Sequence, residues 1–165
     1  MLRVNNWQPP RWFRVWMLYA TRGGDGWAWY TLGALILLFG GPDRWVALAA
    51  AAAAVGGGIG LFLWLKRLIG RQRPCTIERH CWHTLLPPDQ FSFPSGHTIT
   101  AFAVAVTIMH FYPALEPVLW FCALSVAASR VVLGMHFLSD VIAGAGLGGV
   151  LGCGAFLVAG WLSRS

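Results

Sequence analysis

The sequence predicts an all-α integral membrane bundle, with about five crossings and one helix in the membrane interface, six helices in all. Three observations predict this class. Hydrophobic residues make up 57% of the chain and charged residues 11%, against about 25% charged in soluble proteins. Residues 45–65 and 141–162 carry no charge, and roughly 20 such residues span a bilayer core. Ten tryptophans suit the membrane–water interface. At this length, residues 1–165 are expected to form one domain.

The sequence of the N-terminal half predicts three helices. Residues 11–22 are aromatic and basic and too short to cross a bilayer, so we expect a helix lying in the interface. The glycine-rich segment 23–26 is predicted to be a turn that ends it. A short first crossing then covers 27–39, the segment 40–43 closes it, and the second crossing covers about 45–65.

The C-terminal half begins with the long polar segment 66–93, which concentrates basic residues, cysteines, histidines and prolines. A loop of this length in a small protein is usually functional. A third helix is expected from 95 to 111 and a fourth from 117 to 133. Gly134 interrupts the pattern, and a last helix is expected over 136–162.

Pairs of glycines four residues apart predict close helix packing. On one face of a helix such spacing lets two backbones approach each other. The pairs are Gly56/Gly60, Gly144/Gly148 and Gly148/Gly152.

A first group of ionisable residues lies where the second crossing ends. Charged groups at a membrane edge are costly and therefore candidates for function. Lys66 and Arg73, the latter followed by Pro74, are the candidates here. Arg67 and Arg71 are more simply interpreted as side chains that reach the lipid head groups.

A second group, Pro94-Ser95-Gly96-His97, precedes an apolar helix. Ser95 is a favourable N-cap, and Gly96 allows a ligand to approach the backbone. The free amides of a helix start form an anion site. The alternative is an ordinary capped helix start in which His97 has no role.

A third group consists of Ser129-Arg130, His136 and Asp140. On a helix, His136 and Asp140 would share one face. Asp140 could then accept a hydrogen bond from one imidazole nitrogen and leave the other free to attack. The alternative is a pair that only satisfies its own hydrogen bonds between helices.

The three groups are predicted to converge. The second crossing and the fourth helix end on one side of the membrane. The third helix and the last helix begin on that same side. Cations and amides would then surround the oxygens of a phosphoryl group, with a nucleophile in line and an acid opposite. This is the constellation that phosphoryl transfer requires.

These groups resemble a known family. Lys66-x6-Arg73-Pro74, Pro94-Ser95-Gly96-His97 and Ser129-Arg130-x5-His136-x3-Asp140 are similar to the three-part signature of the type 2 phosphatidic acid phosphatase superfamily. The match covers residues 66–140. The resemblance implies that His136 forms a phosphohistidine, oriented by Asp140, while His97 protonates the leaving oxygen. It also implies no metal or other cofactor, and a set of phosphate ligands: Lys66, Arg73, Ser95, the Gly96 amide and Arg130.

The resemblance implies hydrolysis of a membrane lipid phosphate or pyrophosphate, such as undecaprenyl pyrophosphate, phosphatidate, phosphatidylglycerophosphate or lipid A phosphate. Two alternatives stay open: a phosphotransferase that passes the group to a hydroxyl acceptor, and a carrier without catalysis. The net charge of +6 lies beside membrane segments, so we expect lipid head groups rather than nucleic acid as partners.

The observations conflict on which side of the membrane the active site faces. A disulfide between Cys75 and Cys81 would require an oxidising compartment; free thiols, or zinc held with His80 and His83, are the alternatives. The positive-inside rule favours a cytoplasmic site instead, although three of the charges counted are the proposed phosphate ligands. We expect a bacterial inner membrane protein with a periplasmic site.

Overall fold

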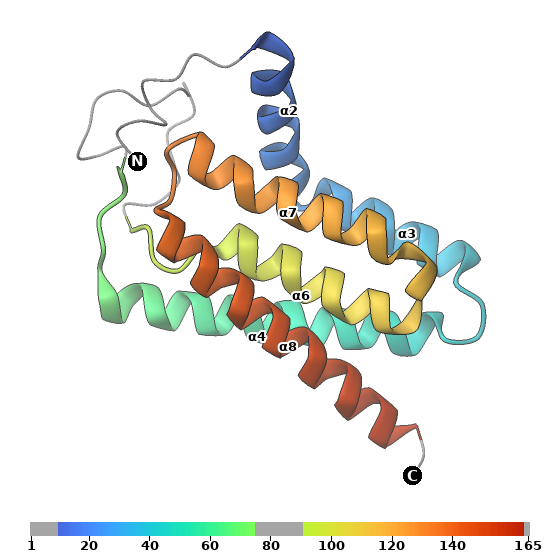
Figure 1. Ribbon diagram of the computed structural model, residues 1–165. Coiled ribbons are helices and arrows are strands. Elements are labelled where there is room, and N and C mark those ends of the chain that lie inside the picture. The colour runs from blue at the N-terminus through green and yellow to red at the C-terminus, as the bar shows by residue number, and fades with distance from the viewer. Residues whose placement is uncertain (1–9, 75–90, 164–165) are drawn as a thin grey trace.

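The structure, a computed structural model, describes residues 10–74 and 91–163. The described residues form helices throughout, which confirms the predicted class. In Figure 1 the helices α3, α4, α6 and α7 run alongside one another, α8 crosses them obliquely, and α2 stands at an angle at one end. The helices are α2 (Arg11–Arg22), α3 (Ala28–Phe39), α4 (Arg44–Ile69), α6 (Gly96–Phe111), α7 (Glu116–Val132) and α8 (Leu138–Leu162).

The chain changes direction at the predicted turn 23–26, where η1 (Gly23–Trp27) joins α2 to α3. The path kinks at Gly26, whose φ of 126° is a conformation that favours glycine. The two helices therefore leave the bend in different directions (Figure 1).

The predicted close packing by glycines of α8 is confirmed against α6. A Cβ at Gly148 would overlap the carbonyl oxygen of Ile99 and lie 2.9 Å from the Cβ of Phe102. Equivalent positions on the same face lack space in the same way, so α8 fits its neighbour only without side chains there. The glycines of this contact are Gly144, Gly148 and Gly152.

The equivalent prediction for α4 is wrong. Gly56 and Gly60 face open space. Instead Gly58 makes the close contact, because a Cβ there would lie 2.8 Å from Ile99. The turn of α4 that faces α6 is thus shifted by two residues from the spaced pair.

Three of the described helical segments are long and apolar enough to cross a membrane: α4, the stretch Pro113–Val132 that joins the 3₁₀ turn η2 (Pro113–Leu115) to α7, and α8. The apolar α6 is shorter, at 16 residues. The number of five crossings and the interfacial position of α2 stay predictions.

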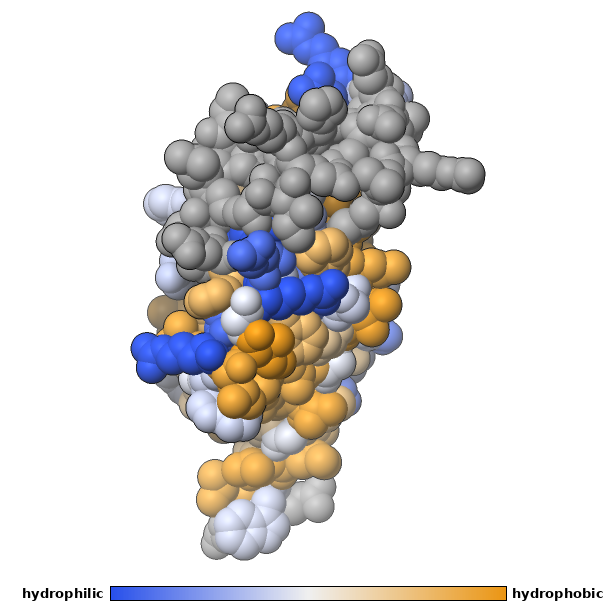
Figure 2. All heavy atoms as spheres, turned by 90° about the vertical axis from the view of Figure 1, so that its left-hand side faces the viewer, coloured by the Kyte–Doolittle hydropathy of each residue, from blue (hydrophilic) through white to orange (hydrophobic). Residues whose placement is uncertain are grey.

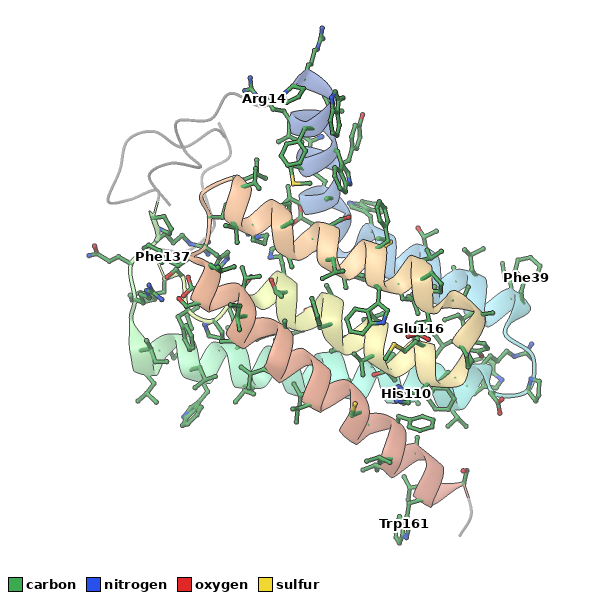
Figure 3. All side chains as sticks on the ribbon, in the orientation of Figure 1. Arg14, Phe39, His110, Glu116, Phe137 and Trp161 are labelled. Atoms are coloured by element: carbon green, nitrogen blue, oxygen red, sulfur yellow. The ribbon has the colours of Figure 1, made fainter. Side chains whose placement is uncertain are left out.

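One end of the bundle gathers four helix termini, in the arrangement that the topology predicted. The C-terminal ends of α4 and α7 and the N-terminal ends of α6 and α8 meet at the left of Figure 1. In Figure 3, Phe137 lies at this end, and Phe39 and Glu116 lie at the opposite end. Figure 2 looks onto the first end and shows hydrophilic residues bordered by hydrophobic helix surface.

Candidate active site

His136 lies in a turn between α7 and α8, not on the last helix as predicted. Gly134 has a φ of 72° and ends α7. The amides of Met135 and His136 then donate to the carbonyl of Arg130, at 3.1 and 3.0 Å. The helix resumes only at Leu138. His136 is therefore held on irregular backbone, and it is 2% exposed.

Two contacts fix the imidazole of His136. Its Nδ1 lies 2.6 Å from the backbone carbonyl oxygen of Ser92, to which Nδ1–H donates. Its Nε2 then carries the lone pair, which lies 3.2 Å from a guanidinium nitrogen of Arg73. The second nitrogen is thus unprotonated and next to a cation, as a nucleophile that approaches an anion requires.

The predicted hydrogen bond between Asp140 and His136 is wrong. The Oδ2 atom of Asp140 lies 3.9 Å from Nδ1 of His136, which is too long for a hydrogen bond. The backbone carbonyl of Ser92 is the hydrogen-bond partner of His136 instead of Asp140. Ser92 is held in this position because its amide donates to the carbonyl of Arg71 at 2.7 Å, which joins the two ends of the long loop. A backbone carbonyl leaves no signal in the sequence.

Asp140 instead fixes the start of α8. Its fully buried carboxylate accepts a hydrogen bond from the amide of Phe137 at 2.9 Å, which satisfies a free donor of the helix start. Its backbone carbonyl accepts from the amide of Ser95 at 3.1 Å. Asp140 thereby ties the turn that carries His136 to the start of α6.

The sequence favoured an interpretation of Arg71 as a side chain that reaches the lipid head groups. In the structure it also contacts the start of α8. Its guanidinium donates to Asp140 Oδ1 and to Ser139 Oγ, both at 2.8 Å. It also lies 4.1 Å from the ring centroid of Phe137. Arg71 therefore clamps the first turn of α8, a role that its spacing from Arg73 did not indicate.

Helix α6 starts at the predicted residues, but without the predicted side-chain cap. Ser95 is the N-cap residue, with φ −78° and ψ 105°, and Gly96 is the first helical residue. The hydroxyl of Ser95 accepts from Thr98 Oγ1 at 2.9 Å rather than capping an amide. A Cβ at Gly96 would lie 3.1 Å from the ring of Phe62, so this approach favours glycine.

Three buried cations come from different elements. Lys66 lies in the last turn of α4, with its Nζ 4.3 Å from the ring centroid of Phe62. Arg73 donates to the carbonyl of Met135 at 3.0 Å, and Arg130 on α7 donates to the hydroxyl of Thr21. All three are at most 6% exposed. Buried cations concentrated in this way attract an anion strongly.

A single cavity of about 650 Å³ brings most of the predicted site residues together. Six of them line it, while Ser95 and Asp140 are buried behind its wall. Its other walls are apolar and come from α3, α4 and α6, with Ile36, Val55 and Ile108 among them. The six lining residues are Lys66, Arg73, Gly96, His97, Arg130 and His136.

The cavity also contains a residue that sequence reasoning missed. Asp25, from η1, places its Oδ1 2.6 Å from Nε2 of His97. The two residues are 72 positions apart, so no local spacing indicated the pair.

Burial lowers the pKa of His136 well below 6.5, and the charges of Arg130 and Arg73 lower it further. The imidazole is therefore neutral at pH 7, with its Nε2 lone pair available. Cys75, Cys81, His80 and His83 lie outside the described residues. Within the described ranges, no three His, Cys, Asp or Glu side chains group as a metal site.

The family model of the PAP2 superfamily matches residues 44–164 of this chain. The chain belongs to the PAP2 superfamily. The match confirms the resemblance to the type 2 phosphatidic acid phosphatases. Together with its apolar helices, it makes this PAP2 chain an integral membrane protein.

Curated PAP2-like relatives are phosphatases by name. A lipid A 1-phosphatase from Rhizobium etli is 31% identical over 76% of this chain and 62% of its own length. A decaprenylphosphoryl-5-phosphoribose phosphatase from Mycobacterium tuberculosis is 33% identical, over 90% of this chain and 84% of its own length. This chain thus spans less than two thirds of the Rhizobium relative.

Solved structures share the fold. LpxE from Aquifex aeolicus has a TM-score of 0.77 and 26% identity, and the match covers 92% of this chain and 89% of that one. A transmembrane PAP2-type phosphatidylglycerolphosphate phosphatase from Bacillus subtilis has a TM-score of 0.69 over 99% of this chain and 82% of that one. At 24% identity, the similarity to the Bacillus subtilis structure shows only that the two chains share a fold.

Proposed function

We propose that the protein hydrolyses a phosphate or pyrophosphate ester of a membrane lipid through a phosphohistidine. The observation that carries this proposal is the composition of the cavity. Buried cations and two histidines form one part of it, and apolar residues of α3, α4 and α6 form the rest. A ligand that fits both parts has an anionic head and an apolar tail. The names of the relatives, which are phosphatases of lipid phosphates, support the same reaction.

The reaction follows from the positions of the two histidines. Nε2 of His136 attacks phosphorus, and the bond to the lipid oxygen breaks as the P–N bond forms. His97 gives its proton to that oxygen, and the lipid alcohol leaves. His97 then takes a proton from water, which attacks phosphorus, releases phosphate and restores His136. Lys66, Arg73 and Arg130 stabilise the charge on the remaining phosphoryl oxygens.

The substrate candidates are those named from the sequence. Undecaprenyl pyrophosphate, phosphatidate, phosphatidylglycerophosphate and lipid A phosphate all combine a phosphate head with long apolar chains. Relatives named for lipid A, for a decaprenyl lipid and for phosphatidylglycerophosphate support a choice within this class. A periplasmic site in a bacterial inner membrane stays a prediction.

The test is phosphate release by purified protein in detergent from a panel of these lipids, with glycerol phosphate as a head group without a tail. We expect kcat/KM for at least one lipid to exceed that for glycerol phosphate by about 100-fold or more, because each buried methylene contributes about 0.8 kcal/mol. EDTA should leave the activity unchanged, since cationic side chains take the place of a metal.

Different results would select the alternatives. Equal activity on glycerol phosphate would contradict the role of the apolar walls. Loss of activity in EDTA with rescue by a divalent metal would contradict a metal-free site. A phosphorylated acceptor in place of free phosphate indicates a phosphotransferase, and lipid binding without turnover indicates a carrier.

Replacing Arg71 with alanine should lower kcat by roughly 10- to 100-fold, because the first turn of α8 loses its clamp and His136 shifts. Arg67→Ala is the matched control: it removes an exposed arginine from the same polar stretch, and it should retain wild-type activity. Phosphate release by both variants, beside their melting temperatures, is the measurement. Equal activity of the two variants would show that the contacts of Arg71 with Asp140 do not serve catalysis.

A further inference from the structure

Asp25 has no part in the reaction as described so far, yet it touches a reacting residue. It lies in η1, and its Oδ1 is 2.6 Å from Nε2 of His97 at the start of α6. It also lines the cavity. A carboxylate beside an anion site repels the substrate, and the side chain of Asp25 is 55% exposed. Its presence therefore calls for a function that offsets this repulsion.

The backbone around Asp25 fits closely against the site. A Cβ at Gly24 would lie 2.9 Å from Cγ1 of Val126 on α7 and 3.4 Å from Cδ2 of His97. On the other side, Gly26 adopts a φ of 126°. Gly24 thus lets the bend approach α6 and α7, and Gly26 permits the backbone conformation of the bend. The fold, and not a local sequence contact, brings the carboxylate to His97.

The charges around His97 indicate a role for the carboxylate of Asp25 in keeping His97 protonated. Burial and the charges of Arg130 and Arg73 lower the pKa of His97 below 6.5, while the hydrogen bond and the charge of Asp25 act in the opposite sense. A general acid has to carry its proton when the substrate arrives. An anion in hydrogen-bond contact supports that protonated form against burial and the two arginines.

His97, and not His136, has the short contact with a carboxylate. Asp25 and His97 are separated by 2.6 Å, whereas Asp140 and His136 are separated by 3.9 Å. Of the acidic residues that the structure describes, these two are the ones paired with the site histidines. The carboxylate–histidine pair expected from the sequence at the nucleophile is therefore found at the other histidine.

We propose that Asp25 is a positioning residue for His97, an inference that rests on the proposed function. Its carboxylate accepts a hydrogen bond from Nε2–H, which leaves Nδ1 as the atom that transfers the proton. In the first step the Nδ1 proton passes to the lipid oxygen as the P–O bond breaks. In the second step Nδ1 takes a proton from the attacking water. Asp25 accepts the hydrogen bond in both steps and takes part in neither proton transfer.

The experiment compares leaving groups. Asp25→Asn keeps the size of the side chain and removes its charge. On phosphatidate, whose alcohol leaves only with a proton, kcat should fall about 100-fold, the lower end of what general acid catalysis contributes. On p-nitrophenyl phosphate, whose phenolate leaves without one, kcat should fall less than about threefold, because protonation no longer limits. Asp43→Asn, at the far end of α4, is the matched control and should not change either rate.

A second measurement decides the case even if p-nitrophenyl phosphate is a poor substrate. Added to His97→Ala, Asp25→Asn should cause no further loss on phosphatidate, because residues that act through one another are not additive. Independent, additive losses would overturn the inference. So would equal losses on both substrates together with a lowered melting temperature, or a gain in kcat/KM from removal of the anion. Wild-type protein that releases no phosphate from any substrate would overturn the proposed function, and the inference with it.

Discussion

Replacing His136 with alanine is expected to lower phosphate release by about 10³-fold or more, which is the scale of losing a catalytic nucleophile. The structure places the unprotonated Nε2 beside the guanidinium of Arg73 in the cavity wall. The measurement is kcat on the best lipid of the panel, with the variant shown to be folded by its melting temperature and its elution in detergent.

His110→Ala is the control for this variant. His110 lies near the opposite end of α6 (Figure 3), where its Nδ1 contacts the carbonyl of Val106 at 2.6 Å. It should keep wild-type activity. A brief reaction with ³²P-labelled lipid, stopped at alkaline pH, should label wild-type protein with an acid-labile phosphate and leave His136→Ala unlabelled. Label on another residue, or release from His136→Ala at more than about a tenth of the wild-type rate, would contradict the nucleophilic role.

The parts of the fold that the sequence predicted are those that local patterns determine. Uncharged apolar runs mark α4 and α8, and Ser95 marks the start of α6. Because the helices are few and their connections fix their directions, the order of the helices also predicted the end at which the signature residues meet. The spacing of residues within one helix likewise predicted the face of α8 that packs on α6.

The errors in the site arise where tertiary contacts override local spacing. The spacing of His136 and Asp140 implied a helical pair, but Gly134 ends α7 with a positive φ and leaves His136 outside any helix. The imidazole then takes its partner from Ser92, 44 residues away. Asp25 reaches His97 across 72 residues. Neither contact has a period or a spacing that a single sequence could reveal.

The second large effect is expected on stability. Gly148→Val should lower the melting temperature in detergent by roughly 5–10 °C, because overpacking a close contact typically costs about 1–3 kcal/mol. The new side chain would overlap the carbonyl oxygen of Ile99 and lie 2.9 Å from the Cβ of Phe102, so α6 and α8 have to separate. The neighbouring Gly149 has no atom within 4 Å of its added Cβ, which makes Gly149→Val the matched control.

The same separation should also reduce activity, because the contact lies close to the site. Ile99 is in the first turn of α6, and its amide donates to the carbonyl of Ser95 at 3.0 Å. A shift of this turn moves His97 and the amides proposed to bind the anion relative to His136, and displacements of about 1 Å can cost about 100-fold in rate. Gly149→Val should change neither the melting temperature nor kcat. Equal melting temperatures for the two variants would show that α6 and α8 do not depend on the contact at Gly148.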